Sequence, residues 1–345
     1  MQKLLPTVFL LLFPVILFAA APKMPDSYPG SFSIAPDGLT LAVGYYDGTI
    51  ALFDTVTGNL KTSIKSGKAK IVSLEFSPDG KWLAAGDDSG SLHLVDLTTL
   101  KKKHKLKVSG SKSVYLMAFS PDSLKLAAAV DDDVALLVFD IASGKTLSSF
   151  SRMSGAEDKY AREKNDFRLL TGGYDQIAWS GEGSLYTWRR MTRYLRKFSP
   201  NGQPAQEWHI EGYYELMYIP AKDRVMAFGL ISPSRNQEIQ MLSPADLSPV
   251  GDIKPLGLET DSDPQKPLVS PDGRFILVIQ KSPEVILHIY SAEPFSIKAS
   301  LKISGRAVKT NSDGSQILWY DSNKKSLILM DWATQTVIKE IPVHT

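Results

Sequence analysis

The sequence predicts an all-β fold, a seven-bladed β-propeller of four-stranded antiparallel blades. One observation behind this prediction is a strand–turn–strand–turn–strand pattern over Ser73 to Asp96, which returns in degraded copies along the 345 residues. The second is the spacing of the copies, because repeats of about 40 residues that cannot bury both of their own faces are typical of propellers. The third turn residue of the seven copies lies at positions 37, 79, 122, 182, 222, 272 and 313.

The repeated stretch has the chemistry of short strands joined by tight turns. Pro78 presets the backbone angle of the first turn, and Gly80 relieves its exit. Before this turn apolar and polar residues alternate, which is the two-residue period of a strand. After it, runs that are apolar on both faces fit a sheet covered on each side by a neighbouring blade. Clear copies of the first turn start at Ala35, Ser77, Ser120, Ser270 and Asn311.

The copies weaken in the middle of the chain. Ser180 to Gly183 aligns with the first turn as Ser-Gly-Glu-Gly, whereas Tyr218 to Gly229 keeps only the apolar pattern. Most intervals between copies are 40 to 43 residues, but those before the fourth and sixth copies are 60 and 50. Long connections are therefore expected before blades 4 and 6. The last unit supplies its own four strands, so ring closure is expected to rest on packing between the first and last blades.

In these features the chain resembles the WD-repeat family. The resemblance rests on the Ser-Pro-Asp-Gly turns, the Leu-Ala-x-Gly strands and Gly48 to Asp54, which stands where the family has Gly-Thr-Val-Arg-Leu-Trp-Asp. It is strongest over residues 31–150. Ser-Gly pairs replace the family's Gly-His, so its Asp–His–Ser–Trp network is not expected as a set. The resemblance implies a rigid scaffold that binds other proteins and has no chemistry of its own.

The first 21 residues are predicted to be a signal peptide, followed by a lead-in at 22–30 and the propeller at 31–345. Lys3 precedes an apolar run from Leu4 to Phe18 and three alanines. Pro22 directly after Ala21 is unfavourable for cleavage, which leaves an uncleaved anchor as the alternative. The chain has no cysteine and no Asn-x-Ser/Thr acceptor. We therefore expect an exported protein of a bacterial envelope, periplasmic or secreted, without a membrane span once the signal is removed.

Composition and motifs argue against most catalytic and polyanion-binding functions. A net charge of +2 does not favour nucleic acid or anionic membranes as partners. The five histidines lack metal-ligand spacing, and a structural role is favoured for each of them, His93 and His288 included. No phosphate loop or nucleophile elbow occurs. We expect no catalytic residues, no metal and no cofactor. The runs Asp87–Asp88 and Asp131–Asp133 are interpreted as solvated turns, because they lack a spaced calcium loop.

One face of the ring is expected to carry the irregular features. The chain runs down, up, down, up in each blade, so the inter-blade connections and the turns between second and third strands emerge on the same side. We call this side the connection face. It is predicted to be acidic at blades 1–3 and basic at blade 4. The candidate site there, an arginine cluster with two rings for stacking, consists of Trp188, Arg189, Arg190, Arg193 and Tyr194.

Three functions remain open for this surface, together with two structural alternatives. The leading interpretation is an exported, non-enzymatic scaffold that binds another protein. The alternative is an enzyme or binding protein for an anionic small molecule at the central opening, anchored by the arginines; a third is binding to an anionic envelope polymer. Structurally, the arginines could be a solvated hairpin or pair with Glu157, Asp158 and Glu163. Lys101 to Lys107 is expected on the outer strand of blade 2, where lysines protect a sheet edge.

Overall fold

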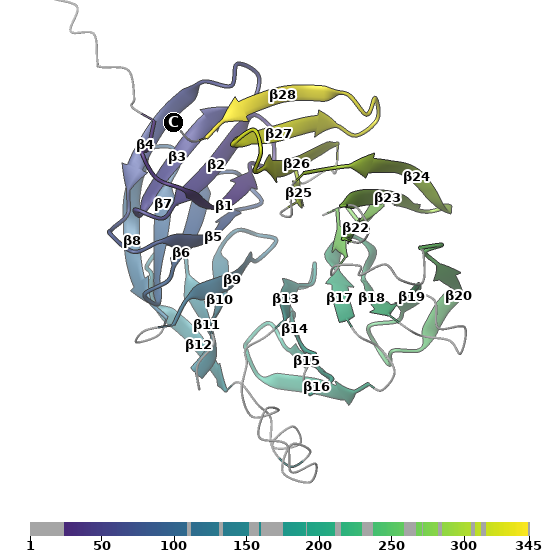
Figure 1. Cartoon of the computed structure of the whole chain (residues 1–345). Coiled ribbons are helices and arrows are strands. Elements are labelled where there is room, and N and C mark those ends of the chain that lie inside the picture. Colours follow the sequence, from purple (N-terminus) through teal and green to yellow (C-terminus); the bar gives the residue numbers. More distant parts are fainter. Residues whose placement is uncertain are drawn as a thin grey trace, which may run out of the picture.

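The computed structural model describes residues 24–343 except 109–111, 131–133, 152–158, 160–174, 191, 211–214, 230–236, 259–266, 271, 282–284, 305–307 and 312–314. In this part of the chain seven four-stranded antiparallel sheets form a ring around a central opening (Figure 1). The predicted fold class is confirmed. The predicted signal peptide lies outside the described residues, as do Glu157, Asp158 and Glu163. No helix among the described residues is both long and apolar enough to cross a membrane.

The strands of each blade are contiguous in the chain and pair in chain order. Blades 1–3 contain β1 (Pro29–Ile34), β2 (Thr40–Tyr45), β3 (Thr49–Asp54), β4 (Leu60–Lys65), β5 (Ile71–Phe76), β6 (Trp82–Asp87), β7 (Ser91–Asp96), β8 (Lys101–Lys107), β9 (Val114–Phe119), β10 (Lys125–Val130), β11 (Val134–Asp140) and β12 (Thr146–Ser151). Blades 4 and 5 contain β13 (Gln176–Trp179), β14 (Leu185–Arg189), β15 (Tyr194–Phe198), β16 (Pro204–His209), β17 (Glu215–Ile219), the 3-10 turn η2 (Pro220–Lys222), β18 (Arg224–Gly229), β19 (Glu238–Leu242) and β20 (Pro249–Pro255). Blades 6 and 7 contain β21 (Leu268–Val269), β22 (Phe275–Gln280), β23 (Ile286–Ala292), β24 (Phe295–Lys302), β25 (Val308–Thr310), β26 (Gln316–Asp321), β27 (Ser326–Asp331) and β28 (Val337–Pro342).

The first turn of the repeat is held by a serine and an aspartate. In blade 2 the Ser77 hydroxyl donates to Asp79 at 2.6 Å and accepts from the Trp82 N–H at 2.9 Å. Gly80 takes a left-handed conformation with φ +69°, as its place in the turn requires. Ser120 and Ser270 repeat the serine–aspartate contact at the same distance. These turns lie on the side opposite the connection face, which we call the turn face.

The core consists of apolar clusters between neighbouring blades. The cluster between blades 7 and 1 closes the ring: Phe53 from β3 and Leu329 from β27 are both buried in it. The Tyr45 hydroxyl also donates to the Val343 carbonyl at 2.8 Å. Figure 1 shows these two blades, purple and yellow, side by side near the C-terminus. Blade 7 takes all its strands from the C-terminal end, so packing closes the ring, as expected.

Strand register identifies equivalent positions in the seven blades. In each blade the pairing of the second and third strands starts from an apolar pair such as Leu41 with Phe53, or Leu83 with Val95. Counting from that pair, the last residue of the second strand occupies the same place in every blade, on the connection face. That residue is Tyr45, Asp87, Val130, Arg189, Gly229, Gln280 or Asp321.

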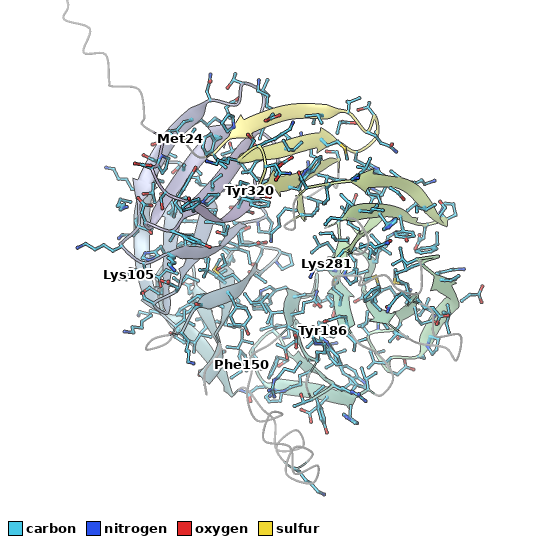
Figure 2. The ribbon with its side chains drawn as sticks, in the orientation of Figure 1. Met24, Lys105, Phe150, Tyr186, Lys281 and Tyr320 are labelled. Carbon is cyan, nitrogen blue, oxygen red and sulfur yellow. The ribbon has the colours of Figure 1, made fainter. Side chains whose placement is uncertain are left out.

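The lysine-rich segment Lys101–Lys107 is the outer strand β8 of blade 2, as predicted. All five of its lysines are exposed, whereas His104 and Leu106 between them are partly buried, and Figure 2 places Lys105 at the outer rim of the ring. An exposed strand edge with a row of positive charges repels pairing with another sheet. The position therefore agrees with edge protection.

Candidate interaction surface

The arginine hairpin of blade 4 is more deeply packed than the sequence suggests. Trp188 and Arg189 are each 1% exposed, and Tyr194 is 9% exposed with its ring 4.9 Å from that of His209. Trp188 packs with Leu195 and neighbouring blade 5 residues in one apolar cluster. The prediction that Trp188 and Tyr194 form a stacking surface is therefore wrong, because both rings are buried.

Arg189 is buried because of its place in the repeat. It is the last residue of β14, and the residues at this position in blades 2, 6 and 7, which are Asp87, Gln280 and Asp321, are buried as well. The structure thus keeps a polar side chain at this inter-blade position in four blades. The guanidinium of Arg189 is therefore buried and is not accessible to a partner in solution.

Arg190 and Arg193 remain at the surface of the connection face. Arg190 Nη1 lies 3.0 Å from Glu215 Oε1, and its backbone N–H donates to Asp175 at 2.6 Å. Glu215 is buried at the start of β17, so this ion pair ties the blade 4 hairpin to the inner strand of blade 5. Arg193 takes a left-handed conformation with φ +58° and is exposed. Its guanidinium makes no hydrogen bond or ion pair within the described part of the chain.

Arg196 and Lys197, two further cations on β15, do not join this surface. Arg196 is buried, with Nε 3.6 Å from Glu207 and its guanidinium carbon 4.8 Å from the centre of the Phe198 ring. Lys197 lies on the opposite side of β15 and lines a cavity on the turn face. The basic character of the connection face at blade 4 therefore comes from Arg190 and Arg193.

Two exposed tyrosines lie on the same face at blade 1, beside a partly buried tyrosine of blade 7, and sequence reasoning missed them. Tyr28 is 63% exposed and Tyr46 is 46% exposed. Lys70 places its ammonium 5.1 Å from the centre of the Tyr46 ring. Tyr320, at the end of β26, is partly buried and close enough to Tyr28 for their hydroxyls to interact electrostatically. The adjacent residues Tyr45 and Tyr46 could have predicted an exposed ring, because neighbouring residues of an extended chain point to opposite sides.

The aspartates predicted to make blades 1 and 2 acidic have protein partners. Asp47 forms an ion pair with Lys65 at 2.7 Å. Burial raises the pKa of Asp47, but hydrogen bonds from Lys65 and Thr49 outweigh it and lower the pKa overall. Asp87 is buried and hydrogen-bonded, so its interpretation as a solvated turn residue is wrong. Asp131 to Asp133 lie outside the described residues.

His93 and His288 occupy equivalent places and have structural partners. His93 Nε2 lies 2.9 Å from Asp87, and His288 Nε2 lies 2.9 Å from Gln280. Each partner is the last residue of the second strand. Burial favours the uncharged form and lowers the pKa of His288. Within the described residues, no group of three or more histidine, cysteine or carboxylate side chains could hold a metal ion.

The inner wall of blades 1–3 is hollowed by a cavity of about 270 Å³. Its lining includes Glu75 and Tyr115 from the inner strands and Lys309 from blade 7. Burial raises the pKa of Glu75, against the opposing effect of Lys309. None of the arginines of blade 4 lines this cavity.

Comparison with known proteins agrees with this architecture. Residues 61–121 match a family model described as the WD40 domain of anaphase-promoting complex subunit 4. No curated protein sequence matches the chain. Among solved structures, the fold is similar to the β-propeller domain of Cps50 (Swd1) from Myceliophteria thermophila, with a TM-score of 0.66 and 15% identity. That match covers 89% of this chain and 96% of the other. The resemblance to the WD-repeat family is confirmed, and the chain has the fold of a WD40 β-propeller.

Proposed function

We propose that the protein is a scaffold that binds another protein through its connection face. WD40 propellers in general serve as surfaces for protein interaction, and this fold supports that role here. The observation that carries the proposal is that one face presents both exposed arginines, at blade 4, and exposed tyrosines, at blade 1. Tyrosine and arginine are the residue types most enriched among binding hot spots.

The positions of these residues suit a broad, rigid contact. Tyr46 and Arg193 both belong to turns between second and third strands, so the strands beneath them fix their positions. Arg190 is further held by its ion pair with the buried Glu215. Side chains that are already ordered lose less conformational entropy when a partner binds. A partner that covers this face would contact blade 1 and blade 4, on opposite sides of the central opening.

Charge reversal of the two exposed arginines tests this function. We expect the Arg190→Glu, Arg193→Glu variant to lose affinity for the partner by at least about tenfold, which corresponds to about 1.4 kcal/mol. The partner is first captured with the wild-type chain and identified by mass spectrometry. Its affinity for wild type and variant is then compared by surface plasmon resonance.

The matched control is Lys101→Glu, Lys103→Glu, which makes the same charge change on the outer strand β8. This variant should bind the partner like the wild type. Equal affinity in the arginine variant would contradict the site on the connection face. A loss that is the same in both variants would indicate a general charge effect in place of a defined contact.

We further propose that this scaffold is exported, because the first 21 residues have the pattern of a signal peptide. In a bacterial host, the full-length chain with a C-terminal tag should be recovered from the periplasm or the medium. Mass spectrometry of its N-terminus should show whether Ala21 is removed. Replacing Leu10 and Leu11 with arginine should retain the chain in the cytoplasm, because charges interrupt the apolar run. Unchanged fractionation of that variant would contradict export through this segment.

A further inference from the structure

A polar cavity of about 310 Å³ opens on the turn face between blades 4 and 5. It lies on the other side of the ring from the surface proposed to bind a protein. Its lining combines charged, aromatic and proline side chains, and its volume falls in the range of small-molecule sites. The residues that define its chemistry are Glu182, Tyr186, Lys197, Tyr218, Asp223 and Pro244.

The cavity replaces part of the apolar core of the repeat. Tyr186 and Lys197 face each other across β14 and β15. In the other six blades the same cross-strand pair is apolar throughout. Those pairs are Ala42–Leu52, Ala84–Leu94, Ala127–Val138, Met226–Met241, Leu277–Ile289 and Leu318–Leu329. Blade 4 therefore departs from its own repeat by placing a hydroxyl and an ammonium at a core position, and such departures concentrate at functional sites.

The aromatic side chains of the cavity are well ordered by their contacts. The rings of Tyr186 and Tyr218 stack with their centres 4.2 Å apart and their planes 8° from parallel. Lys197 Nζ lies 5.5 Å from the centre of the Tyr186 ring. The Tyr218 hydroxyl donates to Asp223 at 2.6 Å, and Asp223 itself takes a left-handed conformation with φ +46° after η2. The groups that line the cavity are thus positioned before anything binds.

Two charges in the cavity have no protein counter-charge. Lys197 is partly buried and interacts with the hydroxyl and the ring of Tyr186, but it makes no ion pair within the described residues. Glu182 is exposed at the rim and likewise makes no ion pair within them. A partly buried ammonium without a carboxylate is unfavourable, because burial weakens its solvation and no opposite charge compensates. With Asp223, the cavity therefore presents one cationic and two anionic groups to a ligand.

We propose that this cavity binds a small zwitterion of the α-amino acid class. The ligand carboxylate pairs with Lys197, and its ammonium faces Glu182 and Asp223. The Tyr186 hydroxyl lies beside the carboxylate, while Pro220 and Pro244 contact the apolar part of the ligand. A singly charged anion would leave the two carboxylates uncompensated, and a singly charged cation would leave Lys197 uncompensated. The zwitterion satisfies both.

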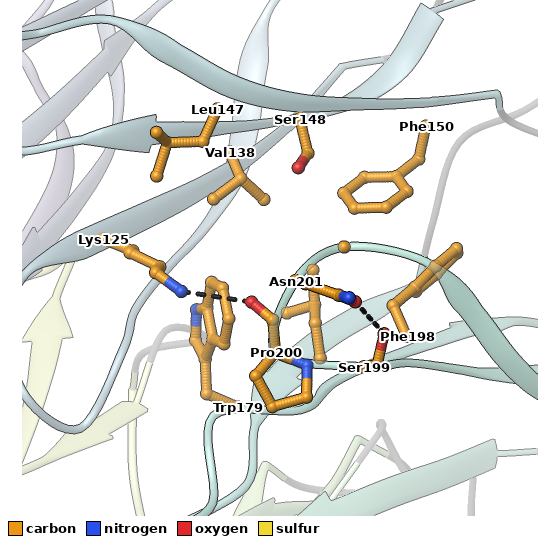
Figure 3. Close-up of a pocket in the computed structure, with 12 residues that line it drawn as sticks. Lys125, Val138, Leu147, Ser148, Phe150, Trp179, Phe198, Ser199, Pro200 and Asn201 are labelled. Carbon is orange, nitrogen blue, oxygen red and sulfur yellow. Dashed lines mark hydrogen bonds between the residues drawn. The ribbon is translucent and has the colours of Figure 1, made fainter.

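The equivalent groove between blades 3 and 4 provides a contrast within the same molecule. It has a volume of about 340 Å³, and Trp179, Phe150 and Phe198 line it (Figure 3). Its lysine, Lys125, already donates to the Pro200 carbonyl at 3.1 Å. The lining of this groove contains Lys125 but no carboxylate. The two grooves flank blade 4, and of these two only the one between blades 4 and 5 combines groups of opposite charge.

The proposal is tested by thermal unfolding of the full chain with each of the twenty L-amino acids. We expect at least one of them to raise the melting temperature by about 4 °C when its concentration is about 100 times its Kd. Propionate and ethylammonium, which carry one charge each, should raise it by less than about 1 °C at the same concentration. Isothermal titration calorimetry then gives the affinity of the amino acid that stabilises most.

The informative variant is Tyr186→Ala, Lys197→Leu, which installs the pair that blades 1 and 2 carry. If the polar pair exists to bind a ligand, this variant keeps or raises the melting temperature of the free protein and loses the amino-acid response. Lys125→Leu in the apolar groove should leave the response unchanged. The proposal is overturned if no amino acid raises the melting temperature, if the single-charge probes act equally, or if the response survives in the double variant.

Discussion

Replacing Tyr45 with alanine is expected to lower the free energy of unfolding by about 4 kcal/mol. The side chain is fully buried in the cluster that joins blades 7 and 1, so its removal leaves a cavity at the ring closure. The hydrogen bond from its hydroxyl to the Val343 carbonyl is lost as well. Burial also raises the pKa of this tyrosine, in keeping with a hydroxyl that stays protonated as a donor. Urea-induced unfolding followed by tryptophan fluorescence measures the loss.

The neighbouring tyrosine supplies the control for this experiment. Tyr46 is 46% exposed on the connection face, and Tyr46→Ala should cost less than about 1 kcal/mol. The two variants delete the same atoms one residue apart. An equal loss of stability in both would contradict the assignment of Tyr45 to the ring closure. Tyr45→Phe should fall between wild type and Tyr45→Ala, because it removes the hydrogen bond and keeps the ring.

The second large effect is expected at Asp87, whose replacement by alanine should cost about 3 kcal/mol. Its carboxylate accepts hydrogen bonds from the backbone of Ser89 and Ser91, and it contacts His93 Nε2 at 2.9 Å. His93 is fully buried, and its other ring nitrogen has no hydrogen-bond partner within the described structure. Asp87→Ala therefore leaves a buried imidazole without its polar contact.

The pH dependence gives an independent check on Asp87. Burial alone would raise its pKa, but the contact with His93 and the hydrogen bonds from Ser91 and Ser89 outweigh it and lower the pKa from 3.8 to about 2. Because the pKa is lower in the folded state, ionised Asp87 stabilises the folded protein at pH values above its ordinary pKa of 3.8. This contribution is lost as the pH falls through about 2. The stability difference between wild type and Asp87→Ala should be constant above about pH 4 and shrink below it.

Asp47→Ala is the matched control, because Asp47 lies in the turn that follows the second strand of blade 1, close to the position that Asp87 has in blade 2. Its side chain is 39% exposed and its partner Lys65 is 56% exposed, so solvent screens the pair. We expect a cost of about 1 kcal/mol or less. If Asp47→Ala and Asp87→Ala lower the free energy of unfolding equally, burial of the Asp87–His93 pair is not the reason why Asp87 stabilises the protein.

The sequence predicted the architecture because turns are local. A Ser-Pro-Asp-Gly segment needs only its own residues to turn the chain, and its recurrence counted the blades correctly. Even blade 5 was found, although Asp223 stands there in a left-handed conformation where five of the other copies have glycine and blade 3 has Ser123. The apolar pattern on both sides of that turn was sufficient.

The candidate site was predicted less well because side-chain exposure depends on neighbouring blades. Arg189 and Arg190 are adjacent and chemically identical in the sequence, yet one is 1% exposed and the other reaches the surface. The difference comes from the position of Arg189 at the end of β14, on the same side of the strand as Leu185, which packs against blade 3. Aligning Arg189 with Asp87 would have predicted that Arg189 is buried, but only if the burial of Asp87 had itself been predicted. The Tyr186–Lys197 pair could have been found the same way, as a polar substitution at an aligned core position.

Contiguous blades also decide how the molecule responds to mechanical load. Each sheet is complete within one segment, so blades 1 and 7 are joined by side-chain packing and the contact of Tyr45 with Val343. A pulling force applied between the two ends of the propeller acts across this junction, since no strand pairing between the described residues of blades 1 and 7 spans it. Apolar contacts separate over short extensions, whereas shearing a strand requires several hydrogen bonds to break together. The closure between the first and last blades is therefore where the ring opens under tension, with the individual sheets still intact.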